Sequence, residues 1–253
     1  MCLINFAYKV DSHYDLVVAA NRDEFYERPT AQADYWEDAP YVLAGRDLKR
    51  RGTWMGITKE GRFAALTNFR DPNEITEGKR SRGEIVSRYL LGNNSPFNYL
   101  STIQNNRKNY PGFNLIVADR ESLYYYSNVE NKIKKLEAGI YGLSNALLDT
   151  NWPKVERGKA ELESCIKKKA ELDLKESLFS MLQHADPVPD RLLPQTGVPI
   201  EWERILSPLF ISSEQYGTRC STVMLKDQEK IQYKERTFNR DVFSDKEYSF
   251  SIS

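Results

Sequence analysis

Short apolar runs separated by polar, turn-forming residues dominate the first 145 residues of the chain. Runs of this kind that are rich in β-branched and aromatic residues predict β-strands. The first two, at 3–10 and 16–21, flank the polar segment DSHYD, which predicts a β-hairpin. Further strands are predicted at 41–47, 53–59, 63–69, 113–119, 123–128 and 132–145.

A helical period interrupts the strands at 81–92, where an apolar stripe ends at Gly92 and the leading SRGE run is typical of a helix cap. Beyond Trp152 the composition shifts to Glu and Lys, and two helices are predicted at 155–170 and 175–185.

The last part of the chain begins with a proline-bearing segment at 186–210. It is too long for a tight connection, so we expect a functional or covering loop. Two strands, at 216–227 and 230–238, then predict a closing hairpin. Two strand-rich blocks accompanied by helices indicate an α+β layered architecture. No linker composition divides residues 1–253, so one domain is predicted.

Charge and composition exclude several classes of function. Lys plus Arg and Asp plus Glu both number 36, so no broad basic field for nucleic acid is expected. No apolar stretch is long enough to span a membrane and no secretory signal begins the chain, which predicts a cytoplasmic protein. The three cysteines fit neither a disulfide framework nor a structural zinc site, and His13 and His184 are not convincing ligands. We therefore expect no metal and no cofactor.

Cys2 raises the first question of chemistry, because it follows the initiator Met1. Removal of Met1 would give one residue that carries both a thiol and a free α-amine, a nucleophile with its own base. The reference pKa values of these groups, about 8.5 and about 7.7 to 8.0, make proton transfer between them inexpensive. Retention of Met1 would leave Cys2 as a small apolar strand residue.

The hairpin register predicts which side chains lie near Cys2. A turn centred on Ser12 and His13 places Cys2 opposite Asp23, with Asn21 on the same face and Arg22 on the other. A carboxylate there could orient the α-amine. Two alternatives stay open: a charged strand end with weak surface ion pairs, or a register shifted by one residue, which would exchange the faces.

Nine short motifs occur in order along almost the whole chain. They are MC at 1–2, NRDE at 21–24, GTWMGI at 52–57, LTNFR at 66–70, SRGEIV at 81–86, FNLIVAD at 113–119, GLSN at 142–145, NWPKV at 151–155 and YGTRCSTV at 216–223. Together they resemble the NRDE family, also called the transport and Golgi organisation protein 2 family.

The resemblance implies an N-terminal nucleophile hydrolase fold, a four-layer αββα sandwich of two antiparallel sheets. Within that class the arrangement is similar to choloylglycine hydrolases and penicillin V acylases. By motif, Cys2 resembles the nucleophile, Asp23 the amine-orienting carboxylate, Asn68 the oxyanion-stabilising amide, Asn145 the second asparagine and Arg219 the late arginine. One departure is that the arginine expected a few residues before the aspartate is here the adjacent Arg22.

These residues support two functions for a small-molecule substrate or ligand. The first is hydrolysis or transfer of an acyl group from a small amide, peptide-like bond or thioester. The second is a non-enzymatic carrier of haem, acyl-CoA or another amphipathic ligand. Structural alternatives also stand: Asn68 as a strand-end asparagine, Arg219 in an ion pair with Asp23 or Glu24, and Cys220 as packing.

Overall fold

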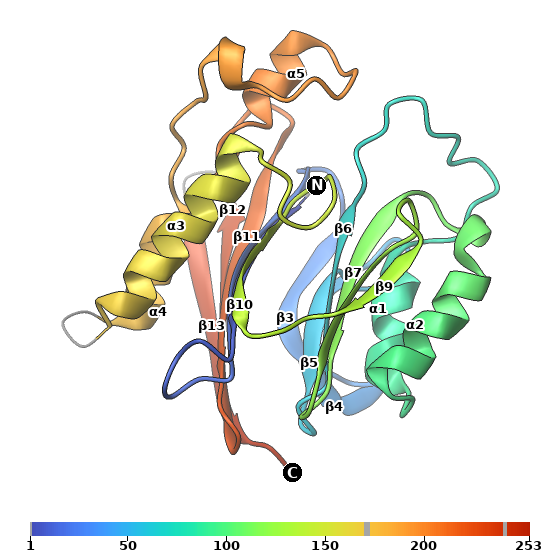
Figure 1. The fold of residues 1–253 in the computed structure, drawn as a ribbon, viewed down its shortest axis with the longest axis vertical. Helices are drawn as coiled ribbons and strands as arrows, with labels where there is room; N and C mark the ends of the chain where they lie inside the picture. The colour runs from blue at the N-terminus through green and yellow to red at the C-terminus, as the bar shows by residue number, and fades with distance from the viewer. Residues whose placement is uncertain (1, 170–172, 240–241) are drawn as a thin grey trace.

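The computed structural model describes residues 2–169, 173–239 and 242–253, and it is built on two antiparallel sheets (Figure 1). The six-stranded sheet has the order β10-β1-β2-β11-β12-β13. Its strands are β10 (Gly139–Leu143), β1 (Cys2–Tyr8), β2 (Leu16–Phe25), β11 (Tyr216–Lys226), β12 (Lys230–Asn239) and β13 (Val242–Ser251).

The seven-stranded sheet runs in sequence order from β3 to β9. Its strands are β3 (Thr30–Trp36), β4 (Ala39–Asp47), β5 (Met55–Thr58), β6 (Phe63–Asn68), β7 (Phe113–Ala118), β8 (Leu123–Ser127) and β9 (Lys132–Lys135). Every strand pairing in both sheets is antiparallel.

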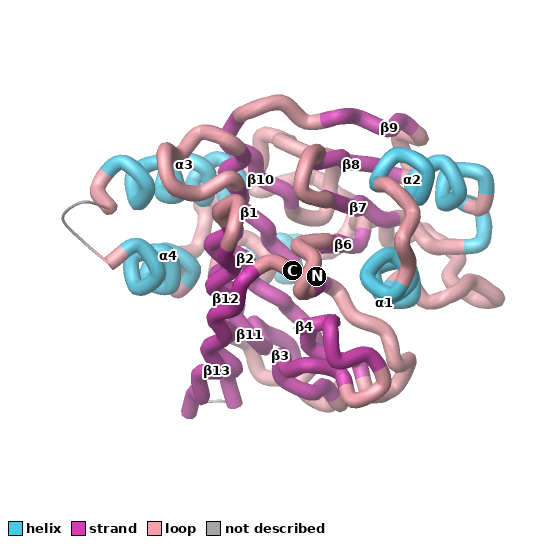
Figure 2. The backbone as a smooth tube through the Cα atoms, turned by 90° about the horizontal axis from the view of Figure 1, so that it is seen from below, coloured by secondary structure: helices cyan, strands magenta, loops and turns pink. Residues whose placement is uncertain are grey.

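Helices cover the outer face of each sheet, as both views show (Figures 1 and 2). The outer face of the six-stranded sheet packs against α3 (Pro153–Lys167) and α4 (Leu174–Leu182). The seven-stranded sheet packs against α1 (Gly83–Leu91) and α2 (Pro96–Asn105). The short helix α5 (Ile200–Ile205) lies in the long loop before β11. The predicted α+β class and αββα sandwich are therefore confirmed.

Burial explains why β1 is apolar at most of its positions, Asn5 being its buried polar residue. Ile4 and Phe6 face the other sheet, whereas Leu3 and Ala7 face the helices. All seven residues are buried, because successive side chains point to opposite faces and both faces are covered.

Among the described strands and α-helices, β3, α2, α5 and β13 were not predicted. The strands β3 and β13 lie at sheet edges and bury few side chains, so they lack the apolar pattern of the central strands. The predicted single strand at 132–145 is wrong, since β9 and β10 belong to different sheets. A continuous strand-like sequence cannot show that the chain crosses between sheets at this point.

The first hairpin forms with a register one residue away from the prediction, because Cys2 pairs with Arg22 and not with Asp23. The last pair is Tyr8 with Leu16, so the turn is centred on Ser12 and not between Ser12 and His13. Lys9 adopts a left-handed φ of 51° and its N–H donates to the carbonyl of Asp15. Asp11 caps the turn by accepting the N–H groups of His13 and Tyr14. The open alternative of a shifted register is thus the correct one.

Among the described residues, none of the helices has both the length and the hydrophobicity that a membrane crossing requires.

Candidate functional site

A cavity of about 410 Å³ opens between the two sheets beside the start of the chain. The six-stranded sheet contributes side chains of β1, β2, β11 and β12. The other sheet contributes residues of β3, β4 and β6, and two loop segments, 50–54 and 76–83, complete the wall. Four of the five predicted site residues line this cavity: Cys2, Asp23, Asn68 and Arg219.

Cys2 occupies the strand end that faces the cavity. Its side chain shares a sheet face with Arg22, and Cys220 on β11 pairs with the other side of Arg22. The residue is only 8% exposed, and this burial raises the pKa of the thiol. The positive charge of Arg22 and the backbone N–H of Asp23 act in the opposite direction. Burial therefore favours the protonated form of the thiol.

Asp23 lies on the adjacent position of β2 and its carboxylate is buried. Oδ1 accepts a hydrogen bond of 2.8 Å from Thr218 Oγ1, which in turn accepts the N–H of Ile211 at 2.9 Å. Burial raises the pKa of Asp23, and the charge of Lys154 opposes that increase. Because Cys2 pairs with Arg22, the side chains of Asp23 and Asn21 point to the sheet face opposite that of Cys2, and the prediction that they share its face is wrong. On that face Thr218 of β11 holds the Asp23 carboxylate.

Lys154, at the start of α3, is the buried cation behind Asp23. Its Nζ donates to the carbonyl of Leu206 at 3.0 Å, and desolvation lowers the pKa of the amine to about 8. Sequence reasoning missed this lysine, because nothing in the NWPKV motif distinguishes a buried lysine from an exposed one.

A buried ion pair fixes the covering loop above these groups. Arg70 Nη1 contacts Glu203 Oε2 at 2.7 Å, and both side chains are nearly inaccessible. Glu203 also accepts the hydroxyl and the N–H of Thr196. The prediction that 186–210 is a covering loop agrees with this contact between α5 and the end of β6.

Asn68 lines the cavity, whereas Asn145 does not line it and contacts the main chain of Asn68 instead. Asn145 Nδ2 donates to the carbonyl of Asn68 at 2.9 Å, and its Oδ1 accepts from Ser144, whose hydroxyl also donates to the carbonyl of Cys2. The Asn145 side chain thus links the main chain at Asn68 to Ser144, which in turn bonds to Cys2. Within the described residues the Asn68 side chain makes no hydrogen bond, so its amide is available to a ligand.

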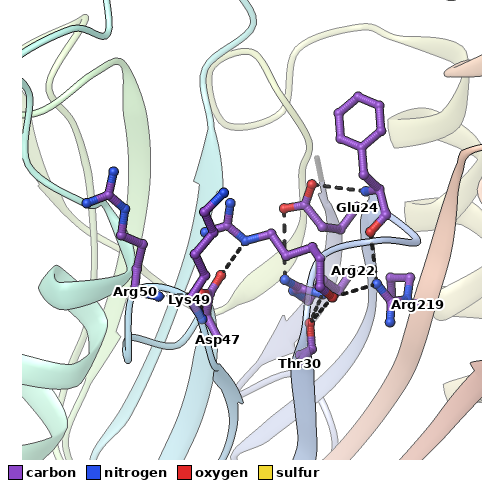
Figure 3. A network of polar contacts seen from close by, with 9 residues as sticks. Arg22, Glu24, Thr30, Asp47, Lys49, Arg50 and Arg219 are labelled. Carbon is purple, nitrogen blue, oxygen red and sulfur yellow. Dashed lines mark hydrogen bonds and ion pairs between the residues drawn. The ribbon is translucent and has the colours of Figure 1, made fainter.

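Arg219 is held by main-chain carbonyls and makes no ion pair with Glu24 among the described residues. Its Nη1 donates to Phe25 O at 2.9 Å and to Arg28 O at 3.1 Å, contacts that Figure 3 shows beside Arg22. It fixes the turn after β2. Arg22 makes a long hydrogen bond of 3.4 Å to Thr30 and lies 3.9 Å from Glu24.

Several cavity residues were missed or misplaced by the sequence analysis. Arg22 was expected on the far face but opposes Cys2, and Cys220 was expected to be packing but borders the cavity. Glu235, a buried carboxylate that accepts the N–H of Ala33 at 2.7 Å, was not anticipated. Arg82 is the N-cap residue of α1, as the predicted helix cap requires, but it makes no side-chain capping bond and it also lines the cavity.

A close contact between Gly52 and Gly83 determines the position of Arg82, and glycines in two motifs were the sequence signal for it. A Cβ on Gly52 would lie 2.6 Å from the backbone of Gly83, so the GTWMGI and SRGEIV motifs touch through glycine alone. This approach brings Arg82 to the cavity. Trp54, from the first of these motifs, also lines it.

No group of three or more His, Cys, Asp or Glu side chains in the described parts of the chain is arranged to hold a metal ion.

Comparison with solved structures defines the class of fold. Two structures of a conjugated bile acid hydrolase from Clostridium perfringens match with TM-scores of 0.51 and 0.53, at 10% and 11% identity. The matches cover 100% and 98% of this chain and 97% and 96% of those chains. A Caenorhabditis elegans N-acylethanolamine-hydrolyzing acid amidase ortholog matches with a TM-score of 0.50, at 12% identity, over 88% of this chain and 92% of that chain. The fold is that of the N-terminal nucleophile hydrolases.

Sequence comparison defines the family. Residues 1–240 match Transport and Golgi organisation 2. The transport and Golgi organization protein 2 homologs of Bos taurus and Homo sapiens are 35% and 34% identical, each over 90% of this chain and 89% of the relative. The Drosophila melanogaster protein is 31% identical over 94% of this chain and 92% of its own length. The chain belongs to the Transport and Golgi organisation 2 family, as its motifs predicted.

Proposed function

We propose that this protein hydrolyses or transfers an acyl group from a small amide, peptide-like bond or thioester, with Cys2 as the nucleophile. The observation that carries the proposal is the position of Cys2 at a cavity wall shared with Asn68, whose amide is free for a ligand among the described residues. The neighbouring solved structures are named as hydrolases of conjugated bile acids and of N-acylethanolamines, both of which fit a role in acyl chemistry.

The reaction begins with removal of Met1, which lies outside the described residues. The α-amine of Cys2 then accepts the thiol proton, and the sulfur attacks the substrate carbonyl to form a C–S bond. Asn68 Nδ2 donates to the oxyanion of the tetrahedral intermediate. As the intermediate collapses, the bond to the leaving group breaks and that group takes the proton from the amine. Water or an acceptor amine resolves the thioester by the same route in reverse.

The buried environment explains why an internal base is needed. Burial raises the pKa of the Cys2 thiol, so little thiolate exists at neutral pH without proton transfer. Arg22, directly opposite Cys2, favours the thiolate once it forms. Asp23, on the next position of β2, supplies the negative charge that orients a protonated amine at the chain start.

The test combines intact-mass analysis with a substrate screen. We expect a native preparation to lack Met1 and to turn over at least one member of a panel of acyl amides and thioesters. Cys2→Ala should abolish turnover, and Cys220→Ala, which changes the other cavity thiol, should retain it. Quantitative retention of Met1, or turnover that survives Cys2→Ala, would overturn the proposal.

The carrier function is the second candidate, and the observation that favours it is the low exposure of Cys2 in the resting structure. Titration with haem and with acyl-CoA separates the two functions. Saturable binding that is unaffected by Cys2→Ala, in a protein without turnover, would select the carrier.

A further inference from the structure

The cavity is far more basic than the chain as a whole. Eight arginine and lysine side chains line it, against four carboxylates, although the formal net charge of the full sequence is zero. Low-dielectric walls concentrate the field of such a lining, and an anion inside would be strongly favoured.

Three of the cations are neutralised by nearby carboxylates. Arg28 contacts Asp47 at 2.6 Å, Arg46 contacts Asp38 at 2.6 Å, and Arg80 contacts Glu84 at 2.6 Å. The remaining excess of positive charge therefore comes from other side chains, and three of these lie on the two loops that close the cavity. They are Arg50, Lys79 and Arg82.

Arg82 is the central member of this group. Its Nη1 donates to the carbonyl of Gly112 at 2.9 Å, and within the described residues no carboxylate forms an ion pair with it. Burial lowers the pKa of Arg82, and the negative charges of Glu74 and of a Cys2 thiolate oppose that change. A partly buried guanidinium without an ion-pair partner is costly, and a bound anion would offset the cost.

Lys79 and Arg50 extend the positive wall toward solvent. The Lys79 ammonium donates to the carbonyl of Lys108, and the main chain of Arg80 is anchored to Asn109 O at 2.8 Å, so the loop is fixed. Arg50 is exposed, and Figure 3 shows its side chain apart from the dashed contacts around Arg22 and Asp47. Both cations have free donors for a ligand.

From this arrangement we infer that the substrate of the proposed reaction is an anion whose carboxylate or phosphate binds Arg82, Lys79 and Arg50 while its acyl carbonyl lies at Cys2. The inference deepens the proposed function and rests on it. Guanidinium groups bind both kinds of anion through paired N–H donors, and the two loops supply donors from different directions.

A matched pair of alkylating reagents tests the charge preference at the nucleophile itself. Iodoacetate and iodoacetamide react alike, since the thiolate sulfur forms a C–S bond and iodide leaves, but only iodoacetate is anionic. The measured quantity is the ratio of the two alkylation rates at Cys2, and peptide mass spectrometry measures each rate. This ratio cancels any change in the amount of thiolate, so it reports anion binding alone.

We expect Arg82→Gln to lower the iodoacetate-to-iodoacetamide ratio roughly tenfold, as loss of one charge-assisted bond predicts. Lys79→Gln and Arg50→Gln should each lower it by a smaller factor, and both are exposed, so they remain informative if Arg82→Gln fails to fold. Lys135→Gln removes an exposed charge on β9, outside the cavity, and should leave the ratio unchanged. Equal ratios in wild type and all three cavity variants would overturn the inference.

Protection experiments distinguish the two sources of negative charge. The measured quantity is the decrease in the rate of iodoacetamide labelling at Cys2. A larger decrease with inorganic phosphate than with acetate would select a phosphate group, and a larger decrease with acetate would select a carboxylate. Protection by neither ion would count against an anion subsite. Labelling needs no turnover, so the two failures are distinguishable. A chain with the charge preference but no acyl hydrolysis or transfer would refute the proposed function and leave an anion subsite at the cavity. Turnover without the charge preference would refute this inference alone.

Discussion

At the scale of single residues, the site depends on polar groups that are buried with specific partners. Asn68 and Asn145 show how two residues of one type differ: the first presents a free amide to the cavity, and the second is bonded to the backbone of the first. The motifs LTNF and GLSN identified both positions. Only the packing shows which of the two has donors left for a substrate.

Substitution of the two asparagines should separate function from stability. Asn68→Ala should abolish most turnover while changing the free energy of unfolding by less than about 0.5 kcal/mol, since no hydrogen bond of the described residues is lost from its side chain. Asn145→Ala removes a buried hydrogen bond and should cost about 1 to 2 kcal/mol in urea denaturation. Equal destabilisation by the two changes would contradict these assignments.

Glu235 gives the site a pH-dependent contribution to stability. Burial raises its pKa above the ordinary 4.5, so the folded chain holds this proton more tightly than the unfolded chain. The stability that Glu235 contributes is therefore fully present below about pH 4.5 and is lost as the pH rises through its folded value. Glu235→Gln keeps an acceptor for Ala33 N–H and removes the titration.

We consequently expect the Gln variant to gain stability relative to wild type as the pH is raised from about 5 to about 8. Urea denaturation of both proteins at each pH measures the difference. A difference that stays constant across this range would show that Glu235 does not titrate abnormally.

At the scale of elements, strands position the candidate catalytic side chains, and loops complete the cavity wall. The strands β1, β2 and β11 bring Cys2, Arg22 and Cys220 side by side. The loop that contains α5 leads to Ile211, whose N–H donates to Thr218, the residue that donates to Asp23. That loop is held by the buried Arg70–Glu203 pair and also by an exposed pair between Arg204 and Asp190.

Matched substitutions in these two ion pairs should have unequal effects. Arg70→Met leaves the Glu203 carboxylate buried without its partner and should destabilise the protein by about 3 kcal/mol or more. Arg204→Met breaks a pair whose side chains are half exposed and should cost less than about 1 kcal/mol. Thermal and urea denaturation of both variants provide the comparison, and similar losses would contradict a structural role for the buried pair.

At the scale of the whole molecule, the two sheets share one apolar core, and each sheet has a second core beneath its helices. Two hydrogen bonds also connect β3 to the other sheet: the N–H of Ala33 donates to Glu235 on β12, and the hydroxyl of Tyr248 on β13 donates to the carbonyl of Ala33. We therefore expect one cooperative unfolding transition, as one domain requires. Fluorescence and circular dichroism should give the same urea midpoint, and two separated midpoints would contradict the prediction.

Local sequence determined the central strands, the helices that begin near residues 83, 153 and 174, and the family itself, since apolar periodicity and ordered motifs are local properties of the chain. It left β3 and β13 unrecognised because exposed edge strands carry little apolar signal. The tertiary structure alone decided the register that places Arg22 opposite Cys2, the crossing of 132–145 between sheets and the basic wall around Arg82. These features depend on turn geometry and on contacts between distant segments, whose energies no short stretch of sequence contains.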